Sequence, residues 1–433
     1  MKAFTEPLLS LAGFEEMTKT AEKSSGLISV TGCIDAQKSQ MIYAFGGHRK
    51  NKLIVTFGEQ KAKELYDEYS FFDKEVVYYP SKDVLFYQSD IRGNLLTAER
   101  IRALKAIREQ ERVTLVTTFD ALMNTMAPIE KMWENVLTLE QEQLLDLKEI
   151  QAALIRMGYE KEYQVQTMGQ FSVRGGILDV FPLTEENPIR IELWGDEIDT
   201  IRYFDCESQK SIENTDRVSI YPAAELVLSD EEKAGGIEKL KAEAKRVSDK
   251  LRKQMKTEEA HRVSVMADEL TEEWGELSMY AGMDAFLSYF FDERVGILDY
   301  FKPSDSLIFF DELTRCTEQG KLTETEFSES MKQRLAMGYI LPGQMNGLFT
   351  EKEIVAKLEK YSCIALAALD NKANGLHQLG SYGIHCQSVS PYNNSFELLI
   401  KDLKRYKKNG YRVILLSGSR TRAKRLSEDI TDQ

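Results

Sequence analysis

A segment near the start of the chain has the residue order of a nucleotide-binding loop. GCIDAQKS, residues 32–39, follows the apolar run LISVT at residues 27–31. P-loop enzymes place GxxxxGK[ST] between a strand and a helix, because the loop's backbone amides cradle phosphates and its lysine neutralises them. The matching residues are Gly32, Lys38 and Ser39. Gln37 replaces the second glycine and Asp35 adds a negative charge, so we predict a degenerate nucleotide site that disfavours ATP.

A second apolar run, SLIFF at residues 306–310, ends directly in Asp311 and Glu312. Acidic residues at such a strand end hold Mg²⁺ and the attacking water in helicase-type ATPases. Taken alone the pattern is weak, and a lysine that opens an amphipathic helix, as Lys38 does, is usually solvated. Together the two segments predict the outline of a helicase-type ATP site that is inactive.

A different kind of chemistry is predicted in the middle of the chain. IRIELW, residues 189–194, alternates like a half-buried strand, so Arg190, Glu192 and Trp194 share the face that points away from the core. Arg174 lies on the outward face of a second run, and we expect its strand to pair beside the first. Arginine and tryptophan projecting from one sheet are typical of a protein-binding hot spot. The alternative is that Trp194 packs on a helix while the arginines pair with nearby acids.

Histidine and cysteine are few and scattered. The four histidines and five cysteines form no CxxC pair or other metal-ligand spacing, so we expect no metal site and reduced thiols. No apolar run approaches the ~18 residues that span a membrane. We therefore expect a cytoplasmic protein without a membrane segment.

The composition is that of a folded protein. The chain has 433 residues, 42% hydrophobic and 29% charged, which suggests about three domains and excludes a disordered chain. Its net charge of −14 argues against non-specific coating of DNA. One stretch near the end is nevertheless basic. Its cations are Lys401, Lys404, Arg405, Lys407, Lys408, Arg412, Arg420, Arg422, Lys424 and Arg425.

The order of apolar runs predicts an α/β fold. Strands and helices alternate over the first 130 residues, which favours a parallel sheet. We expect its first part at 1–138, a small α+β insertion at 139–228, a second part with a helical hairpin at 229–347, and a small α/β domain at 348–433. Strands of that last domain are expected at 363–368, 384–389 and 412–416. The hairpin's apolar stripe comprises Ile237, Leu240, Ala244, Val247, Leu251 and Met255.

Residues 170–205, QFSVRGGILDVFPLTEENPIRIELWGDEIDTIRYFD, strongly resemble the N-terminal region of the bacterial transcription-repair coupling factors (Mfd). The segment GYRVILLSGSRTRAKRLSEDI at 410–430 resembles the same family. RGGILD and GDEID also occur in the excision-repair helicase UvrB, but UvrB keeps an intact phosphate loop. The resemblance covers essentially the whole chain and is least clear over residues 231–284.

The resemblance implies a degenerate, P-loop-type helicase-like domain, built like UvrB but without a working ATPase. Its inserted domain would bind UvrA through Arg174, Arg190 and Trp194, where the family more often has Phe at the last position. The chain would then be an adaptor that recruits UvrA to stalled transcription for nucleotide excision repair, with no cofactor of its own. In the family, ATP, Mg²⁺, double-stranded DNA and RNA polymerase are bound by C-terminal domains, which form an ATP-dependent DNA translocase that displaces stalled polymerase.

Two alternatives stay open. The first is a functional UvrB-type ATPase, which micromolar ATP binding would support. The second is a DNA-binding module that uses the basic stretch at 401–425, which steeply salt-dependent duplex binding would support.

Overall fold

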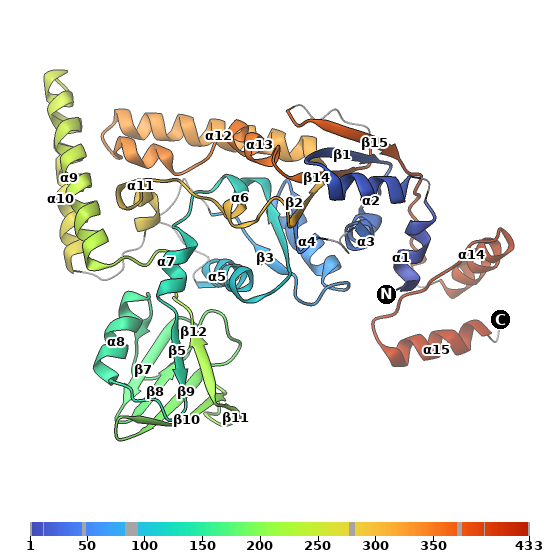
Figure 1. The fold of residues 1–433 in the computed structure, drawn as a ribbon, viewed down its shortest axis with the longest axis horizontal. Coiled ribbons are helices and arrows are strands. Elements are labelled where there is room, and N and C mark those ends of the chain that lie inside the picture. The colour runs from blue at the N-terminus through green and yellow to red at the C-terminus, as the bar shows by residue number, and fades with distance from the viewer. Residues whose placement is uncertain are drawn as a thin grey trace. The chain divides into compact units, whose positions relative to one another are not determined.

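The structure is a computed structural model that describes residues 2–11, 13–45, 49–82, 94–276, 282–369, 375–393 and 395–431. The backbone divides into two compact units, Met1–His385 and Cys386–Gln433. Figure 1 shows the elements of both.

The first unit is organised around a parallel sheet of seven strands in the order β15-β1-β14-β13-β2-β4-β3. The strands are β1 (Gly26–Thr31), β2 (Asn51–Thr56), β3 (Val77–Tyr79), β4 (Val113–Thr118), β13 (Ser306–Asp311), β14 (Ser362–Ala367) and β15 (Gln378–Gly383). Every neighbouring pair is parallel. The middle residues of the central strands are apolar, as in Leu53–Val55 and Leu307–Phe310, which suits strands covered on both faces. The α/β class and the parallel sheet that the sequence predicts are confirmed.

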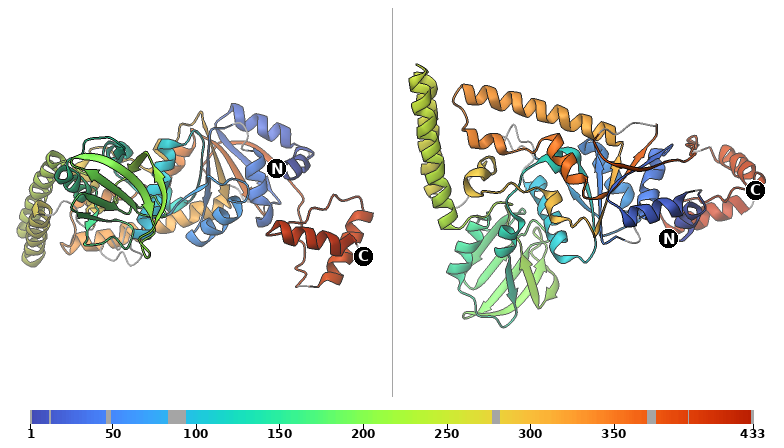
Figure 2. Two further views of the ribbon diagram at one scale, coloured as in Figure 1. Left: turned by 90° about the horizontal axis from the view of Figure 1, so that it is seen from below. Right: turned by 45° about the horizontal axis from the view of Figure 1, so that its top comes forward.

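Helices cover both faces of this sheet, and each face has its own apolar core (Figure 2). Phe309 packs into one core and Phe310 into the other, because successive strand residues point to opposite faces. The core that contains Phe309 is covered by α1 (Lys2–Leu9), α2 (Phe14–Lys23), α3 (Asp35–Phe45) and α4 (Glu59–Tyr69). The core that contains Phe310 is covered by α5 (Asn94–Glu109), α6 (Phe119–Met123), α7 (Ile129–Glu134), α12 (Leu313–Ala336) and α13 (Glu351–Leu358).

The segment between α7 and α9 forms the inserted domain. It comprises β5 (Leu137–Glu140), α8 (Leu147–Arg156), β6 (Glu160–Lys161), β7 (Gln170–Arg174), β8 (Ile177–Val180), β9 (Ile189–Trp194), β10 (Glu197–Phe204), β11 (Ser211–Thr215) and β12 (Arg217–Ile220). Six strands form a mixed sheet in the order β11-β10-β9-β8-β7-β6, and β12 pairs with β5. The strand that carries Arg174 was expected beside the strand that carries Arg190. This is wrong, because β8 lies between them.

A helical hairpin follows, formed by α9 (Asp230–Lys253) and α10 (Thr257–Glu276). The apolar stripe of α9 packs against α10 in a shared core that also contains the buried Trp274, so the predicted hairpin is confirmed. Met255, expected in this stripe, lies beyond the end of α9 with a positive φ and is exposed. Short helices lead back to the sheet: η1 (Met283–Phe286), α11 (Leu287–Phe290), η2 (Ile297–Tyr300) and, after α12, η3 (Pro342–Asn346).

The small domain expected at 348–433 is divided between the two units. β14 and β15 are strands of the main sheet, so residues 362–383, which the sequence analysis assigned to the small domain, complete the first unit. The second unit begins at Cys386 and contains α14 (Phe396–Lys408) and α15 (Arg420–Thr431). The strands expected at 384–389 and 412–416 are wrong, because both stretches lie outside regular structure and their apolar side chains have no paired strand to cover them.

A buried ion network joins α5 to the chain that leaves the inserted domain. The Arg100 side chain is fully buried, and its Nε donates to Glu225 Oε1 at 2.7 Å. Lys82 Nζ lies 3.0 Å from the same oxygen. Burial alone raises the pKa of Glu225, but attraction to Arg100 and Lys82 outweighs it and lowers the pKa to about 2. The carboxylate therefore stays ionised and neutralises the buried Arg100, while Lys82 also pairs with Asp284.

We predict that Glu225→Gln lowers the free energy of unfolding by about 3–5 kcal/mol at pH 7, because it leaves buried Arg100 without its anion. The folded-state pKa lies below the unfolded value, so the stabilisation is complete above about pH 4.5 and is lost as the pH falls toward 2. Urea unfolding between pH 7 and pH 2.5 should show the wild type and the variant converging. Exposed Glu272→Gln is the control, and an offset that does not change with pH contradicts the prediction.

Candidate functional sites

The residues predicted for the degenerate nucleotide site come together at the carboxyl edge of the parallel sheet. Lys38 lies in the first turns of α3, after β1, while Asp311 ends β13 and Glu312 follows it. Lys38 Nζ is 2.5 Å from Asp311 Oδ1, 3.0 Å from Glu312 Oε1 and 2.9 Å from Asp35 Oδ1. The side chains of Lys38 and Asp311 are only 1% and 2% exposed. Lys38 is therefore no solvated helix lysine, and three carboxylates surround its ammonium group.

The backbone of residues 32–39 is engaged within the protein. Gly32 has a φ of +81°, and a Cβ at this position would lie 2.0 Å from the Ile384 carbonyl oxygen. Only glycine fits so close an approach of the chain that follows β15. The Cys33 amide donates to the Ala367 carbonyl, and the Gln37 amide donates to the Ile34 carbonyl. Two amides of the loop are thus bonded to carbonyl oxygens in place of a phosphate.

The other groups around this loop extend the ion cluster. Thr56 Oγ1 donates to Asp311 Oδ2 at 2.8 Å, and Lys61 Nζ lies 3.1 Å from Asp35 Oδ2. Ser39 Oγ donates to Glu68 and not to the Asp311 carboxylate. Burial by itself lowers the pKa of Lys38, but attraction to Asp311 and hydrogen bonds to the carboxylates raise it well above its usual value. The lysine charge is thus neutralised internally, which opposes the role it has in a phosphate loop.

The residues predicted for partner binding lie on the outer face of the mixed sheet. Asp179 of β8 is 1% exposed and lies between the two arginines. Arg190 donates to it twice, from Nε at 2.7 Å and from Nη2 at 2.8 Å. Arg174 donates one hydrogen bond to the same carboxylate, at 2.7 Å. Arg190 is 12% exposed and also covers the Phe204 ring, whereas Arg174 is 33% exposed. Arg174 is the more accessible of the two cations.

Trp194 is the most accessible of these three residues. It ends β9 at the turn into β10, and it is 85% exposed. The alternative that Trp194 packs on a helix is therefore wrong, while the alternative that the arginines pair with a nearby acid is correct. The acid is Asp179, which was not among the predicted residues. The alternation of ILDV could have identified it, because Leu178 and Val180 point inward and leave Asp179 outward.

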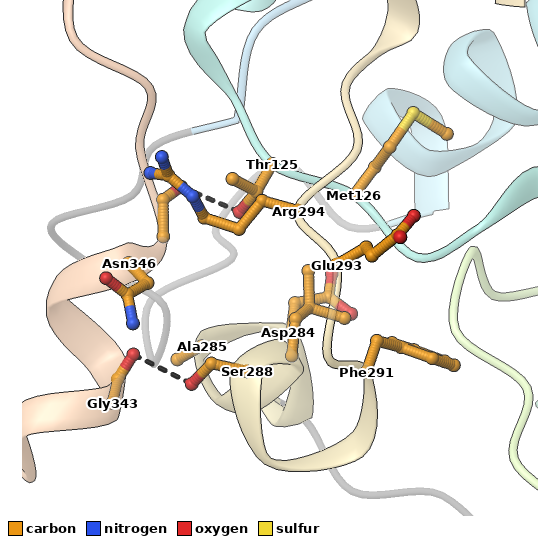
Figure 3. Close-up of a pocket in the computed structure, with 12 residues that line it drawn as sticks. Thr125, Met126, Asp284, Ala285, Ser288, Phe291, Glu293, Arg294, Gly343 and Asn346 are labelled. Atoms are coloured by element: carbon orange, nitrogen blue, oxygen red, sulfur yellow. Dashed lines mark hydrogen bonds between the residues drawn. The ribbon is translucent and has the colours of Figure 1, made fainter. Parts of the chain in front are cut away.

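A small pocket lies between α11, η3 and the chain at residues 125–126 (Figure 3). Ser288 Oγ donates to the Gly343 carbonyl at 2.8 Å, and Thr125 Oγ1 donates to the Gly347 carbonyl at 2.9 Å. These hydroxyl groups connect neighbouring chain segments, and none of the residues predicted for a site lines this pocket. Among the described residues, no group of three His, Cys, Asp or Glu side chains is placed to hold a metal ion. No helix within the described ranges is long and apolar enough to cross a membrane.

Comparison with known proteins assigns a family to the inserted domain and relatives to the whole chain. Residues 137–226 match the family described as "UvrB interaction domain". The chain is 26% identical over 382 residues to the transcription-repair-coupling factor of Bacillus subtilis, which covers 88% of this chain and 32% of that protein. It is 25% identical over 432 residues to the factor of Staphylococcus aureus (strain MRSA252), covering 97% and 35%. The chain spans about a third of these relatives, and the resemblance to transcription-repair coupling factors is confirmed.

We predict that Lys38→Met lowers the free energy of unfolding by about 3–5 kcal/mol, because it leaves the Asp311 carboxylate buried without a counter-charge. Lys61→Met is the matched control: Lys61 pairs with the largely exposed Asp35, so its removal should cost less than about 1 kcal/mol. Chemical denaturation at pH 7 measures both. Equal stability of Lys38→Met and the wild type would mean that Lys38 does not neutralise Asp311.

Proposed function

We propose that this chain is the UvrA-recruiting region of a transcription-repair coupling factor and acts in nucleotide excision repair as an adaptor. The match of residues 137–226 to the UvrB interaction domain carries this proposal. The main sheet would be a helicase-like domain that has lost its ATPase, split by the inserted domain at 139–228. The full-length protein would use ATP, double-stranded DNA and RNA polymerase through regions outside this chain, as a DNA translocase that displaces stalled polymerase.

The outer sheet face supports a protein partner. Trp194 offers an exposed aromatic surface, and such residues are frequent anchors of binding energy. Arg174 uses one guanidinium nitrogen on Asp179, which leaves donors for carboxylates of UvrA. Arg190 makes three hydrogen bonds within the domain, so we propose that it stabilises the outer face as well as contacting UvrA.

The closed ion cluster supports the absence of ATPase activity in this chain. A bound triphosphate would have to compete with Asp311, Glu312 and Asp35 for Lys38. It would also have to displace the carbonyl partners of the loop amides. DNA binding by the basic stretch has weaker support, because Arg405 pairs with Asp402 and acidic residues are interspersed on both helices.

We predict that Trp194→Ala weakens the binding of purified UvrA by about thirtyfold or more, as the loss of a central anchor does. Arg174→Glu should also abolish capture, because it replaces an attractive charge with a repulsive one. Surface-immobilised chain titrated with UvrA measures both. Ile155→Ala is the control, since Ile155 is an exposed apolar residue of α8, outside this face.

The same variants should separate binding from folding. Trp194→Ala should leave the thermal melt unchanged, because the side chain is 85% exposed. Arg190→Ala should lower the melting temperature, because Asp179 then keeps only one hydrogen bond from Arg174. Undiminished capture by Trp194→Ala and Arg174→Glu would overturn this assignment.

We predict that neither the wild type nor Gln37→Gly hydrolyses ATP. The substitution removes one side chain, but Lys38 stays bound to its carboxylates and Ile384 still lies against Gly32. Calorimetric titration with Mg-ATP and a phosphate-release assay test both proteins, with an intact P-loop ATPase as the positive control. Micromolar ATP binding by the wild type would favour the UvrB-type ATPase instead.

A further inference from the structure

Leu144 lies in the same row of the sheet as Trp194, with Glu197 between them, although 50 positions separate them in the sequence. Trp194 is the antiparallel partner of Glu197 across the turn from β9 to β10. Leu144 forms an isolated antiparallel bridge to the other side of the same Glu197. Residues paired across strands project to the same face of a sheet. Leu144, Glu197 and Trp194 therefore form one row across the end of the outer face.

The backbone holds Leu144 in this row. The Leu145 amide donates to the Asp196 carbonyl at 2.7 Å, and the Glu142 amide donates to the Ile198 carbonyl at 2.8 Å. Leu145 points the other way and is buried in the core of the inserted domain. Leu144 is 74% exposed and Trp194 is 85% exposed. The backbone hydrogen bonds thus hold two large apolar side chains in exposed positions.

Acidic side chains surround this apolar pair. Glu142, Asp196, Glu197 and Asp199 are all exposed. Within the part of the chain that the structure describes, no ion pair is formed by any of these four. The arginine end of the face, at Arg190, is four residues back along β9, which corresponds to about 13 Å. At the arginine end two cations share the single carboxylate of Asp179, the other end is acidic, and the apolar pair lies at the acidic end.

We propose that Leu144 and Trp194, rimmed by Glu197 and its acidic neighbours, form one docking surface for an apolar recess edged by lysine or arginine. The occupant we assign is UvrA, so this inference rests on the proposed function and extends it. The opposite charges at the two ends of the face admit the partner in one orientation, because the reversed orientation brings like charges together. Leu144 is a specificity residue that the motifs at 170–205 do not contain.

The test measures the affinity of the full 433-residue chain for purified UvrA by calorimetry. Leu144→Ala should weaken binding about tenfold, which is 1.4 kcal/mol. Ile155→Ala, an exposed aliphatic residue on α8, should not. Glu197→Lys should weaken binding more at 50 mM salt than at 300 mM salt, since screening reduces the repulsion it introduces. Thermal melts of all variants should match the wild type, because the substituted side chains are exposed.

The outcomes distinguish the two proposals. If the wild type fails to bind UvrA, both the proposed function and this inference are wrong. If the wild type binds and Trp194→Ala does not, while Leu144→Ala and Glu197→Lys bind like the wild type, the inference alone is overturned. Weakening by Leu144→Ala equal to that by Ile155→Ala would also overturn it.

Discussion

The main sheet depends on how it neutralises Asp311, a carboxylate at the buried end of a central strand. In an ATPase of this architecture, a metal ion and a nucleotide would share that task. Here the Lys38 ammonium lies 2.5 Å from Asp311, and Thr56 donates to its other oxygen. A buried charge must be paired, so the lysine is bound where catalysis would need it free. The same ion pair therefore stabilises the sheet edge and occupies the lysine that a phosphate loop would use.

In the inserted domain, too, a buried carboxylate is neutralised by basic side chains, here on one face of the mixed sheet. Asp179 is buried between Arg174 and Arg190, so the outer face keeps its shape without a partner present. A preformed surface loses less side-chain entropy on binding than a mobile one. Arg202 pairs with Glu192 across β9 and β10 in the same way. The acidic residues around the β9–β10 turn make no such ion pair within the described part of the chain, so we expect them to influence how a partner approaches.

The sequence predicted the α/β class, the parallel sheet, the hairpin and the cluster of Lys38, Asp311 and Glu312, because strand periodicity and motif order are local properties. It did not predict that β14 and β15 join β1, since pairing between distant strands leaves no local signal. Asp179 was not predicted, although the alternation of apolar and polar residues in its strand places it on the outward face. Leu144 could not be predicted, because only the turn at residues 140–145 brings it next to Glu197. Strand alternation placed Trp194 on the outward face and the resemblance implied its partner, while the structure determined its exposure.

The position of β1 between β14 and β15 has a consequence for synthesis on the ribosome. Leu27 pairs with Cys363 and Gln378, so the first strand waits for about 330 further residues, or roughly 20–60 s at bacterial elongation rates. Most strand pairs of the inserted domain join antiparallel neighbours in the sequence, so its contacts are more local than those of β1. It can therefore fold on the emerging chain while the apolar β1 is still unpaired. The outer face of the inserted domain would then form before the main sheet is complete, and the apolar β1 would be open to aggregation or to chaperones during translation.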